Sequence, residues 1–390
     1  MKSIFLSTLA LLTSVACNAQ SQSAETNNKT APKYTYNTVR KAQTLAEAYY
    51  SNDAELYKLV EQAMSKMTPQ EKAAQMIMAA SSETLGFTYL NGTQSLVKNK
   101  QAANVLFLKG NKKDFIKQSQ ELKGYTIADM EPLFACDCEP TLLHNKFPGE
   151  PKMRATSLLK TVDEVNASVD SINTLMDEMG ITINFAPIAD IAVNKDIINR
   201  RSFGNNPNQI VNLAGAFINR TQTNQKVATI KHFPGHGAVT GDTHKQSVAI
   251  KGKMTELPTF DRLIKEHQPL MVMVGHISVS GNPEGYNTEN NRPATTSPRI
   301  MKDLLRDSLG FRGIIVTDAM NMQASKNFPN ADWEAAKAGA DLILMPLNPA
   351  ILNKKIADEI AKGSALGKQF EASVRRIVRL KLAKQQLQNL

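Results

Sequence analysis

The segment 231–244 brings together side chains that could move protons. It reads Lys-His-Phe-Pro-Gly-His-Gly-Ala-Val-Thr-Gly-Asp-Thr-His and contains three of the six histidines of the chain. Asp242 stands two residues before His244, so its carboxylate could bind one imidazole nitrogen and leave the other for proton transfer. This spacing favours acid/base chemistry.

A zinc site is the alternative interpretation of the same segment, with His232, His236 and His244 as ligands. Zinc enzymes commonly space their ligands along a rigid helix, as in His-Glu-x-x-His. Pro234 and the neighbouring glycines indicate a loop instead, which leaves no helix to set the ligand geometry. We therefore expect neither a metal nor a cofactor.

Other ionisable residues stand where apolar runs end. They are Asp137 and Glu139 after 133–136, Asp190 after 181–186, His276 after 270–274 and Asp318 after 313–317. One such residue alone could be structural, but their recurrence at strand ends is hard to explain by packing. In a parallel barrel the carboxyl ends of all strands meet on one rim, where the chemistry is carried out.

The elements that would position these residues alternate along the chain. Apolar runs typical of strands are 75–79, 104–108, 133–136, 181–186, 228–230, 270–274, 313–317 and 341–345. Helical patterns include 161–179, 209–224, 297–309, 331–338 and 370–387. Eight such strands predict an α/β fold, a single TIM-type (β/α)8 barrel. A doubly wound sheet is the rival, but no Gly-x-Gly-x-x-Gly follows the first strand.

The first 39 residues have the sequence features of an exported protein. Lys2 precedes an apolar run at 4–16, and small residues follow, which is typical of a signal peptide over 1–19. The polar residues 20–39 predict a flexible tether. Cys17 offers a second possibility, a lipoprotein anchor, which would attach the chain to a membrane. We expect an exported protein of the periplasm or cell envelope, with a helical extension at 40–66 and a catalytic domain over 40–390.

Composition limits the classes of partner. The chain has 390 residues and a formal net charge of +10. A positive charge of this size suggests a polyanion as partner. No phosphate loop, zinc finger or aromatic-basic motif accompanies the charge, so we expect no nucleic acid and relate the charge to an anionic envelope. Three cysteines are too few for a disulfide scaffold.

The motifs together resemble the β-N-acetylglucosaminidases of glycoside hydrolase family 3, in the subgroup that consists of a single barrel. The resemblance covers the chain after about residue 60. Besides the segment 231–244, its landmarks are Asn-Phe-Ala-Pro-Ile-Ala-Asp at 184–190, Arg-Ser-Phe-Gly at 201–204 and the stretches 313–322 and 338–346.

This resemblance implies a role for each matching residue. Asp318 would be the nucleophile that forms a glycosyl-enzyme intermediate, and His244 the general acid/base with Asp242 as its partner. The implied sugar-binding residues are Asp137, Arg201, Lys231 and His232. The resemblance implies a retaining exo-β-N-acetylglucosaminidase acting on N-acetylglucosamine-containing glycans such as peptidoglycan fragments. We expect the protein to be a monomer.

The chain departs from the subgroup after the third strand. The subgroup has Asp-x-Glu-Gly-Gly-Arg with another arginine three residues later, whereas Pro140 and Thr141 replace the glycines here and both arginines are missing. A cationic contact to the substrate is lost unless Lys146 replaces it. Two alternatives therefore remain: an exported sugar-binding protein with weak or no turnover, and a β-glucosidase or phosphorylase of the same family.

Cys136 and Cys138 flank Asp137. In an extended strand their side chains share one face. We interpret them as two small buried residues beside the site; a redox or metal-binding pair is the alternative.

Overall fold

The computed structural model describes residues 42–86, 92–194 and 197–388. The predicted signal peptide, the tether and Cys17 lie outside the described residues. Within the described ranges, no helix is both long enough and apolar enough to cross a membrane.

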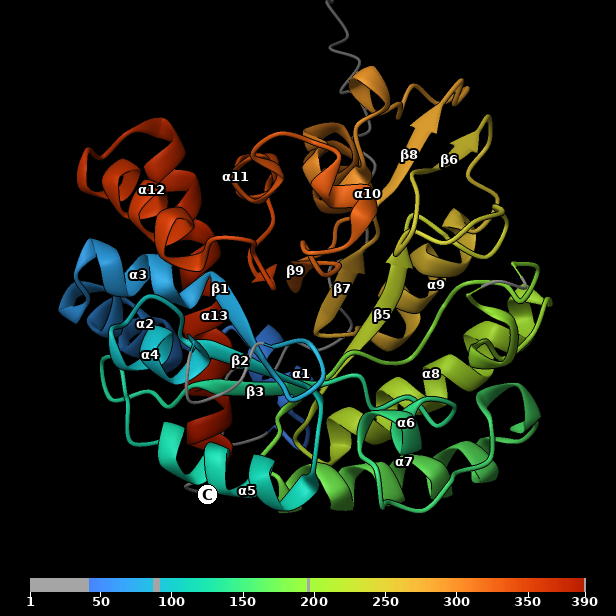
Figure 1. Cartoon of the computed structure of the whole chain (residues 1–390), viewed down its shortest axis with the longest axis horizontal. Coiled ribbons are helices and arrows are strands. Elements are labelled where there is room, and N and C mark those ends of the chain that lie inside the picture. Colours follow the sequence, from blue (N-terminus) through green and yellow to red (C-terminus); the bar gives the residue numbers. More distant parts are fainter. Residues whose placement is uncertain (1–41, 87–91, 195–196, 389–390) are drawn as a thin grey trace, which may run out of the picture.

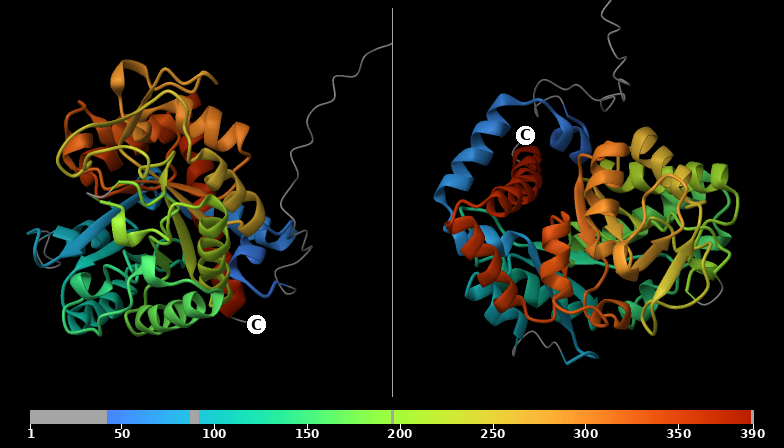
Figure 2. Two further views of the ribbon diagram at one scale, coloured as in Figure 1. Left: turned by 90° about the vertical axis from the view of Figure 1, so that its right-hand side faces the viewer. Right: turned by 90° about the horizontal axis from the view of Figure 1, so that it is seen from above.

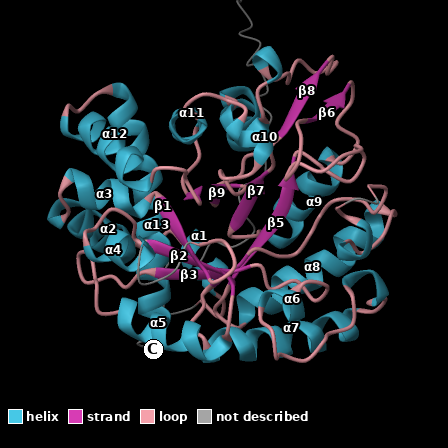
Figure 3. Ribbon diagram, viewed as in Figure 1, coloured by secondary structure: helices cyan, strands magenta, loops and turns pink. Residues whose placement is uncertain are grey.

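Eight parallel strands form the centre of the molecule (Figures 1 and 3). They are β1 (Ile77–Ser82), β2 (Asn104–Lys109), β3 (Leu133–Cys136), β4 (Ile183–Asn184), β5 (Val227–Phe233), β7 (Met271–Val274), β9 (Ile314–Thr317) and β10 (Ile343–Leu344). Their order is β10-β1-β2-β3-β4-β5-β7-β9, and a parallel bridge between Val316 and Leu342 joins the two ends. The result is a nearly closed barrel, and each of the eight expected strands is confirmed.

Helices surround these strands because the strands are apolar on both faces and must be covered. The helices that follow strands are α4 (Gln94–Lys98), α5 (Lys112–Leu122), α6 (Leu143–Lys146), α7 (Val162–Glu178), α8 (Pro207–Thr223), α9 (Leu257–His267), the π-helical segment Arg299–Ser308, α10 (Gln323–Lys326), α11 (Ala331–Ala338), α12 (Pro349–Ala361) and α13 (Ala365–Gln388). Local signals set their starts. Thr161 and Glu164 form a capping box before α7, and Asn206 caps α8 ahead of Pro207.

The predicted helical extension is two helices, not one. α1 (Leu45–Tyr50) and α2 (Ala54–Lys66) are separated at 51–53. A new helix starts after Asp53, because the Asp53 carboxylate accepts a 3.0 Å hydrogen bond from the backbone N–H of Leu56 and so caps the start of α2. α2 packs against α13, and α3 (Pro69–Gln75) then leads into β1 (Figure 2).

A second, small sheet lies beyond the carboxyl ends of β5 and β7 and was not expected from the sequence (Figure 1). β6 (Val248–Lys251) and β8 (Ile277–Ser280) pair in parallel with Val248 opposite Ile277. β6 begins soon after the segment 231–244, so this sheet anchors the far end of that segment.

Candidate active site

A cavity of about 490 Å³ opens at the carboxyl ends of the barrel strands. Six of the seven predicted site residues line it: Asp137, Arg201, Lys231, His232, His244 and Asp318. The seventh, Asp242, is hydrogen-bonded to His244. The structure therefore brings all seven together, although they come from four different parts of the chain.

Asp318 follows β9 and faces this cavity. Its Oδ1 accepts a 2.8 Å hydrogen bond from the backbone N–H of Ala319. Burial acts to raise the pKa of the Asp318 carboxyl, but the imidazoles of His232, His276 and His244 hold that pKa below its ordinary value. Asp318 is therefore ionised at neutral pH, as a carboxylate nucleophile must be.

His276 supports the turn that carries Asp318. Its Nδ1 lies 2.8 Å from Oγ1 of Thr295, and its Nε2 lies 3.0 Å from the carbonyl oxygen of Ala319. The ring is buried, and burial lowers its pKa. Because both ring nitrogens are engaged, His276 acts as a support for the site.

A buried cluster of alternating charges forms one wall of the cavity. Nζ of Lys231 lies 2.9 Å from Oδ1 of Asp137 and 2.6 Å from Oε1 of Glu139. Arg201 binds Glu139 with two hydrogen bonds of 2.7 and 2.8 Å. Lys146 completes the cluster with its Nζ 3.0 Å from Oδ2 of Asp137. Lys146, which the sequence offered as a replacement for the missing arginines, therefore contacts Asp137 directly.

The charges of this cluster stabilise each other. Burial on its own raises the pKa of Asp137, but the charges of Lys146 and Lys231 hold that pKa well below its usual range. For Glu139, burial is likewise outweighed by Arg201 and Lys231, and its pKa falls to about 2. Both carboxylates stay ionised and offer charge-assisted hydrogen bonds, which are stronger than neutral ones.

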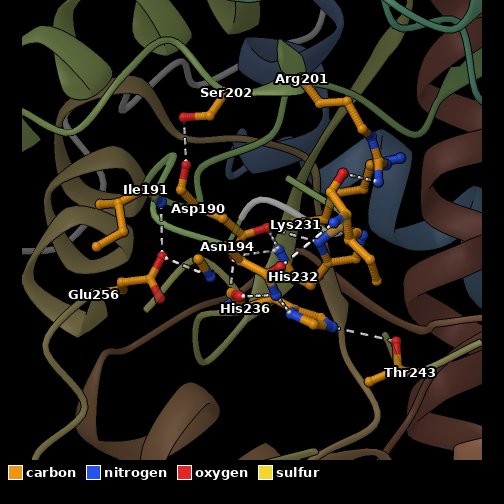
Figure 4. A network of polar contacts seen from close by, with 12 residues as sticks. Asp190, Ile191, Asn194, Arg201, Ser202, Lys231, His232, His236, Thr243 and Glu256 are labelled. Atoms are coloured by element: carbon orange, nitrogen blue, oxygen red, sulfur yellow. Dashed lines mark hydrogen bonds and ion pairs between the residues drawn. The ribbon is translucent and has the colours of Figure 1, made fainter. Parts of the chain in front are cut away.

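Asp190 orients two histidines of the segment 231–244 (Figure 4). Its Oδ2 lies 2.7 Å from Nδ1 of His232, and its Oδ1 accepts a 2.8 Å hydrogen bond from the backbone N–H of His236. Burial raises the pKa of Asp190, and the nearby imidazole of His232 more than offsets this. An ionised Asp190 requires a proton on Nδ1 of His232, which leaves Nε2 of His232 as the nitrogen available in the cavity.

The residues 235–247, here called the dyad loop, hold the predicted proton donor. Nδ1 of His244 lies 2.8 Å from Oδ1 of Asp242, which also accepts the backbone N–H of His244 at 2.8 Å. The backbone N–H and the imidazole of His244 outweigh burial and lower the pKa of Asp242. The His244 side chain is 62% exposed, so its second nitrogen is accessible at the cavity mouth.

The base of the dyad loop is held by polar contacts that the sequence did not reveal. Nδ2 of Asn194 donates to the carbonyl oxygens of His236 and Gly241 at 3.3 and 3.1 Å. Nε2 of His236 lies 3.3 Å from Oγ1 of Thr243 (Figure 4). Across the described ranges, no three His, Cys, Asp or Glu side chains are grouped so as to hold a metal ion.

Glu256 is the most important site residue that the sequence reasoning missed. It directly precedes α9, and its buried carboxylate accepts the backbone N–H groups of Ile191 at 2.8 Å, Ala238 at 2.8 Å and Gly237 at 3.3 Å. Burial and the charge of Asp190 raise its pKa to about 8, against the effect of these N–H groups. Glu256 therefore ties the dyad loop to the loop after β4.

The glycines at positions 235 and 237 were the sequence feature that could have indicated this contact of the dyad loop with Glu256. A Cβ on Gly235 would lie 2.7 Å from Oε1 of Glu256, and a Cβ on Gly237 would lie 2.0 Å from the carbonyl oxygen of Ile191. We expected these glycines to make the loop flexible. Instead they allow the close approach of Glu256 and of the backbone at Ile191.

Cys136 and Cys138 are buried beside the site, as we expected, but they are not two separate small residues. The two sulfurs form a disulfide. β3 ends at Cys136, and the Cα atoms of Cys136 and Cys138 lie 5.4 Å apart, within the range that a disulfide spans.

The fold and the site define the class of protein: a TIM-type barrel that carries ionised carboxylates and an exposed histidine–aspartate pair at the carboxyl ends of its strands. Residues 68–380 match the family described as "Glycosyl hydrolase family 3 N terminal domain". The chain belongs to glycosyl hydrolase family 3, which confirms the resemblance found in the sequence.

Comparison with individual proteins agrees with this family. The chain is 33% identical over 237 residues to a beta-hexosaminidase A of Pseudoalteromonas piscicida, covering 54% of this chain and 39% of that protein. It spans between about two fifths and one half of the first curated relatives that it matches.

Two solved structures show the same fold. The beta-glucoside phosphorylase BglX has a TM-score of 0.75 at 22% identity, with 87% of this chain and 62% of that chain covered. A family 3 beta-N-acetylglucosaminidase from Paenibacillus sp. str. FPU-7 has a TM-score of 0.72 at 24% identity, with 82% and 63% covered.

Proposed function

We propose that this protein is a retaining exo-β-N-acetylglucosaminidase that hydrolyses terminal β-linked N-acetylglucosamine. The observation that carries this proposal is the ionised Asp318 inside a cavity whose mouth holds the His244–Asp242 pair. A carboxylate nucleophile and a separate proton donor are what retention by double displacement requires.

In the first half-reaction, an oxygen of Asp318 attacks the anomeric carbon while His244 donates its proton to the glycosidic oxygen. The bond to the leaving group breaks, and an ester links the sugar to Asp318. In the second half-reaction, His244 accepts a proton from water, the water oxygen attacks the anomeric carbon, and Asp318 is released. Asp242 stabilises the imidazolium form of His244 in each cycle.

The cluster of Asp137, Lys231 and Arg201, together with His232, supplies the contacts to the sugar in this proposal. Asp137 can accept from hydroxyl groups, and Nε2 of His232 can accept one further hydrogen bond. Lys231 and Arg201 keep the carboxylates ionised in a buried place. These groups favour a polar, hydroxyl-rich ligand, and the names of the curated relatives support a hexosaminide as that ligand.

One assay tests this proposal. Aryl β-N-acetylglucosaminide and aryl β-glucoside are incubated with wild-type protein, Asp318→Ala and His244→Ala, each with and without phosphate. We expect release from the first substrate only, the same rate with or without phosphate, and loss of release in Asp318→Ala. The matched control is Asp303→Asn, an exposed carboxylate paired with Arg299.

Other results would replace the proposal. Full activity in Asp318→Ala contradicts the assigned nucleophile. A wild-type protein that binds N-acetylglucosamine but releases nothing is the sugar-binding alternative. Formation of a sugar phosphate, in place of free sugar, identifies a phosphorylase.

We also propose that the protein is exported to the periplasm or cell envelope, where peptidoglycan fragments would be its substrates. The sequence features of residues 1–19 support this, and Cys17 would be the lipid attachment site in a membrane-anchored form. Cell fractionation of the wild type and Cys17→Ser tests both points. Recovery of the wild type in the cytoplasm would contradict export.

A further inference from the structure

The disulfide between Cys136 and Cys138 encloses a single residue, Asp137, whose carboxylate lines the cavity. Both cysteine side chains are buried, so the sulfurs do not face the solvent. The disulfide joins the two sulfurs across Asp137, with the Cα atoms of Cys136 and Cys138 5.4 Å apart, and the Asp137 carboxylate contacts Lys231 and Lys146.

The backbone around Asp137 is held from the neighbouring strand as well. Oδ1 of Asn184 accepts the N–H of Cys138 at 3.1 Å, and Nδ2 of Asn184 donates to the Cys138 carbonyl oxygen at 3.2 Å. The N–H of Phe185 donates to the carbonyl oxygen of Cys136 at 2.8 Å. The disulfide adds a covalent link between the same two residues, so the dihedral angles on both sides of Asp137 are restricted.

The position of this backbone controls two carboxylates of the site. Asp137 meets Lys231 and Lys146, and Glu139, one residue past Cys138, meets Lys231 and Arg201. A change in the backbone at 136–138 would therefore move both acidic groups relative to their cations. The loop after Glu139 begins with Pro140, which restricts the backbone of Glu139 to extended conformations, so the start of this loop is constrained as well.

A role in global stability explains the disulfide less well. The loop that it closes is the shortest that two non-adjacent cysteines allow, and in the chain-entropy account the stabilisation by a disulfide grows with the length of the closed loop. The local effect on Asp137 is the more specific consequence of its place in the fold.

We propose that the Cys136–Cys138 disulfide is a positioning device for the sugar-binding carboxylate of Asp137, so that affinity for N-acetylglucosamine depends on the oxidised state of this pair. The inference rests on the proposed function. Formation of the disulfide removes two electrons and two protons from the two thiols, and the disulfide of a thiol–disulfide exchange partner accepts them and leaves as a dithiol.

The first measurement is the state of the cysteines in the full chain. The wild-type protein is unfolded without reductant, alkylated, and mapped by mass spectrometry. We expect residues 136 and 138 to resist alkylation until a reductant is added. Free thiols at both positions in the folded, active protein would overturn the proposal.

The second measurement is the binding of N-acetylglucosamine by calorimetry, together with KM and kcat on the aryl substrate. In Cys136→Ser/Cys138→Ser we expect affinity to fall about tenfold, the effect of losing one well-placed charge-assisted hydrogen bond. KM should rise by a similar factor while kcat changes less than threefold. Asp303→Asn, in an exposed pair with Arg299, is the control and should leave all three values unchanged.

A double-mutant cycle separates positioning from a merely structural role. In an Asp137→Asn background, breaking the disulfide should weaken binding by less than twofold, because the group that it positions is already altered. Equal weakening in both backgrounds would overturn the proposal. The alanine pair Cys136→Ala/Cys138→Ala repeats the cycle if the serine pair does not fold.

The two proposals fail in distinguishable ways. If the wild type neither binds N-acetylglucosamine nor cleaves the aryl substrate, the proposed function fails and this inference falls with it. If the wild type binds and cleaves, and the serine or alanine pair binds equally well, only the positioning role is overturned.

Discussion

Lys146 places its ammonium group 3.0 Å from Oδ2 of Asp137, while Lys231 contacts the other oxygen, Oδ1, at 2.9 Å. The sequence left open whether any cation replaces the missing arginines of the third-strand loop. Lys146 lies on the cavity wall with its side chain 21% exposed. The loop after β3 therefore supplies a positive charge at the Asp137 carboxylate through Lys146.

Removing that charge should weaken substrate binding. In Lys146→Met we expect KM on aryl β-N-acetylglucosaminide to rise about five- to tenfold, which corresponds to about 1–1.4 kcal/mol for a partly exposed charged contact. Lys146→Arg should keep most of the affinity. An unchanged KM in Lys146→Met would show that this cation does not take part in binding.

Replacing Asp190 should disturb the orientation of His232 and His236 together. Asp190→Asn leaves one oxygen and an amide where two oxygens now accept N–H groups, so we expect the free energy of unfolding to fall by about 2–4 kcal/mol. We also expect kcat/KM to fall by more than tenfold. Asp170→Asn, in an exposed pair with Arg220, is the control and should change stability by less than about 0.5 kcal/mol.

Glu256 should affect turnover more than binding, because it holds the base of the dyad loop and lines no part of the main cavity. In Glu256→Gln the amide N–H₂ group would face at least one backbone N–H that a carboxylate oxygen now accepts. We therefore expect kcat to fall about tenfold, which corresponds to a loss of about 1.4 kcal/mol of transition-state stabilisation. KM should change less than threefold. Glu266→Gln on the same helix is the control, and equal effects on kcat in the two variants would contradict this role.

Lys381 should make stability depend on pH. Its side chain on α13 is buried, its Nζ donates to the carbonyl oxygen of Ala103 at 3.2 Å, and burial lowers its pKa to about 7. In the unfolded chain a lysine titrates near 10.4. Between these two values the unfolded state binds more protons than the native state, so the contribution of Lys381 to stability rises with pH.

Lys381→Met should therefore stabilise the protein most at pH 7 and below, by up to about 5 kcal/mol, since the pKa falls from about 10.5 to about 7 and each pKa unit corresponds to about 1.4 kcal/mol. Urea unfolding at pH 6, 7.5 and 9 should show the difference between variant and wild type narrowing as pH rises. Lys368→Met, at an exposed position of the same helix, should show no such trend. A difference that is equal at all three pH values would contradict the prediction.

The sequence by itself determined the barrel, the family and six of the residues that line the cavity. Each barrel strand is a short apolar run. Such a run can be recognised from residues that are consecutive in the sequence. The site residues follow these runs directly, as Asp318 follows β9 and Asp137 follows β3. Parallel strands then gather their carboxyl ends on one rim, so that order along the chain is enough to predict the neighbourhood.

Only the tertiary structure decided how these residues contact one another. The pairing of Lys146 with Asp137, the contact of Glu256 with the backbone at Ile191 and the break between α1 and α2 depend on where loops meet in space. Cys136 and Cys138 could be assigned to one face from their spacing, but a disulfide also requires that their sulfurs approach each other. Such contacts join segments whose relative positions no local pattern encodes. For that reason the sequence could predict the partnership of Asp242 with His244, two residues apart, but not the contacts of Glu256 or Lys146.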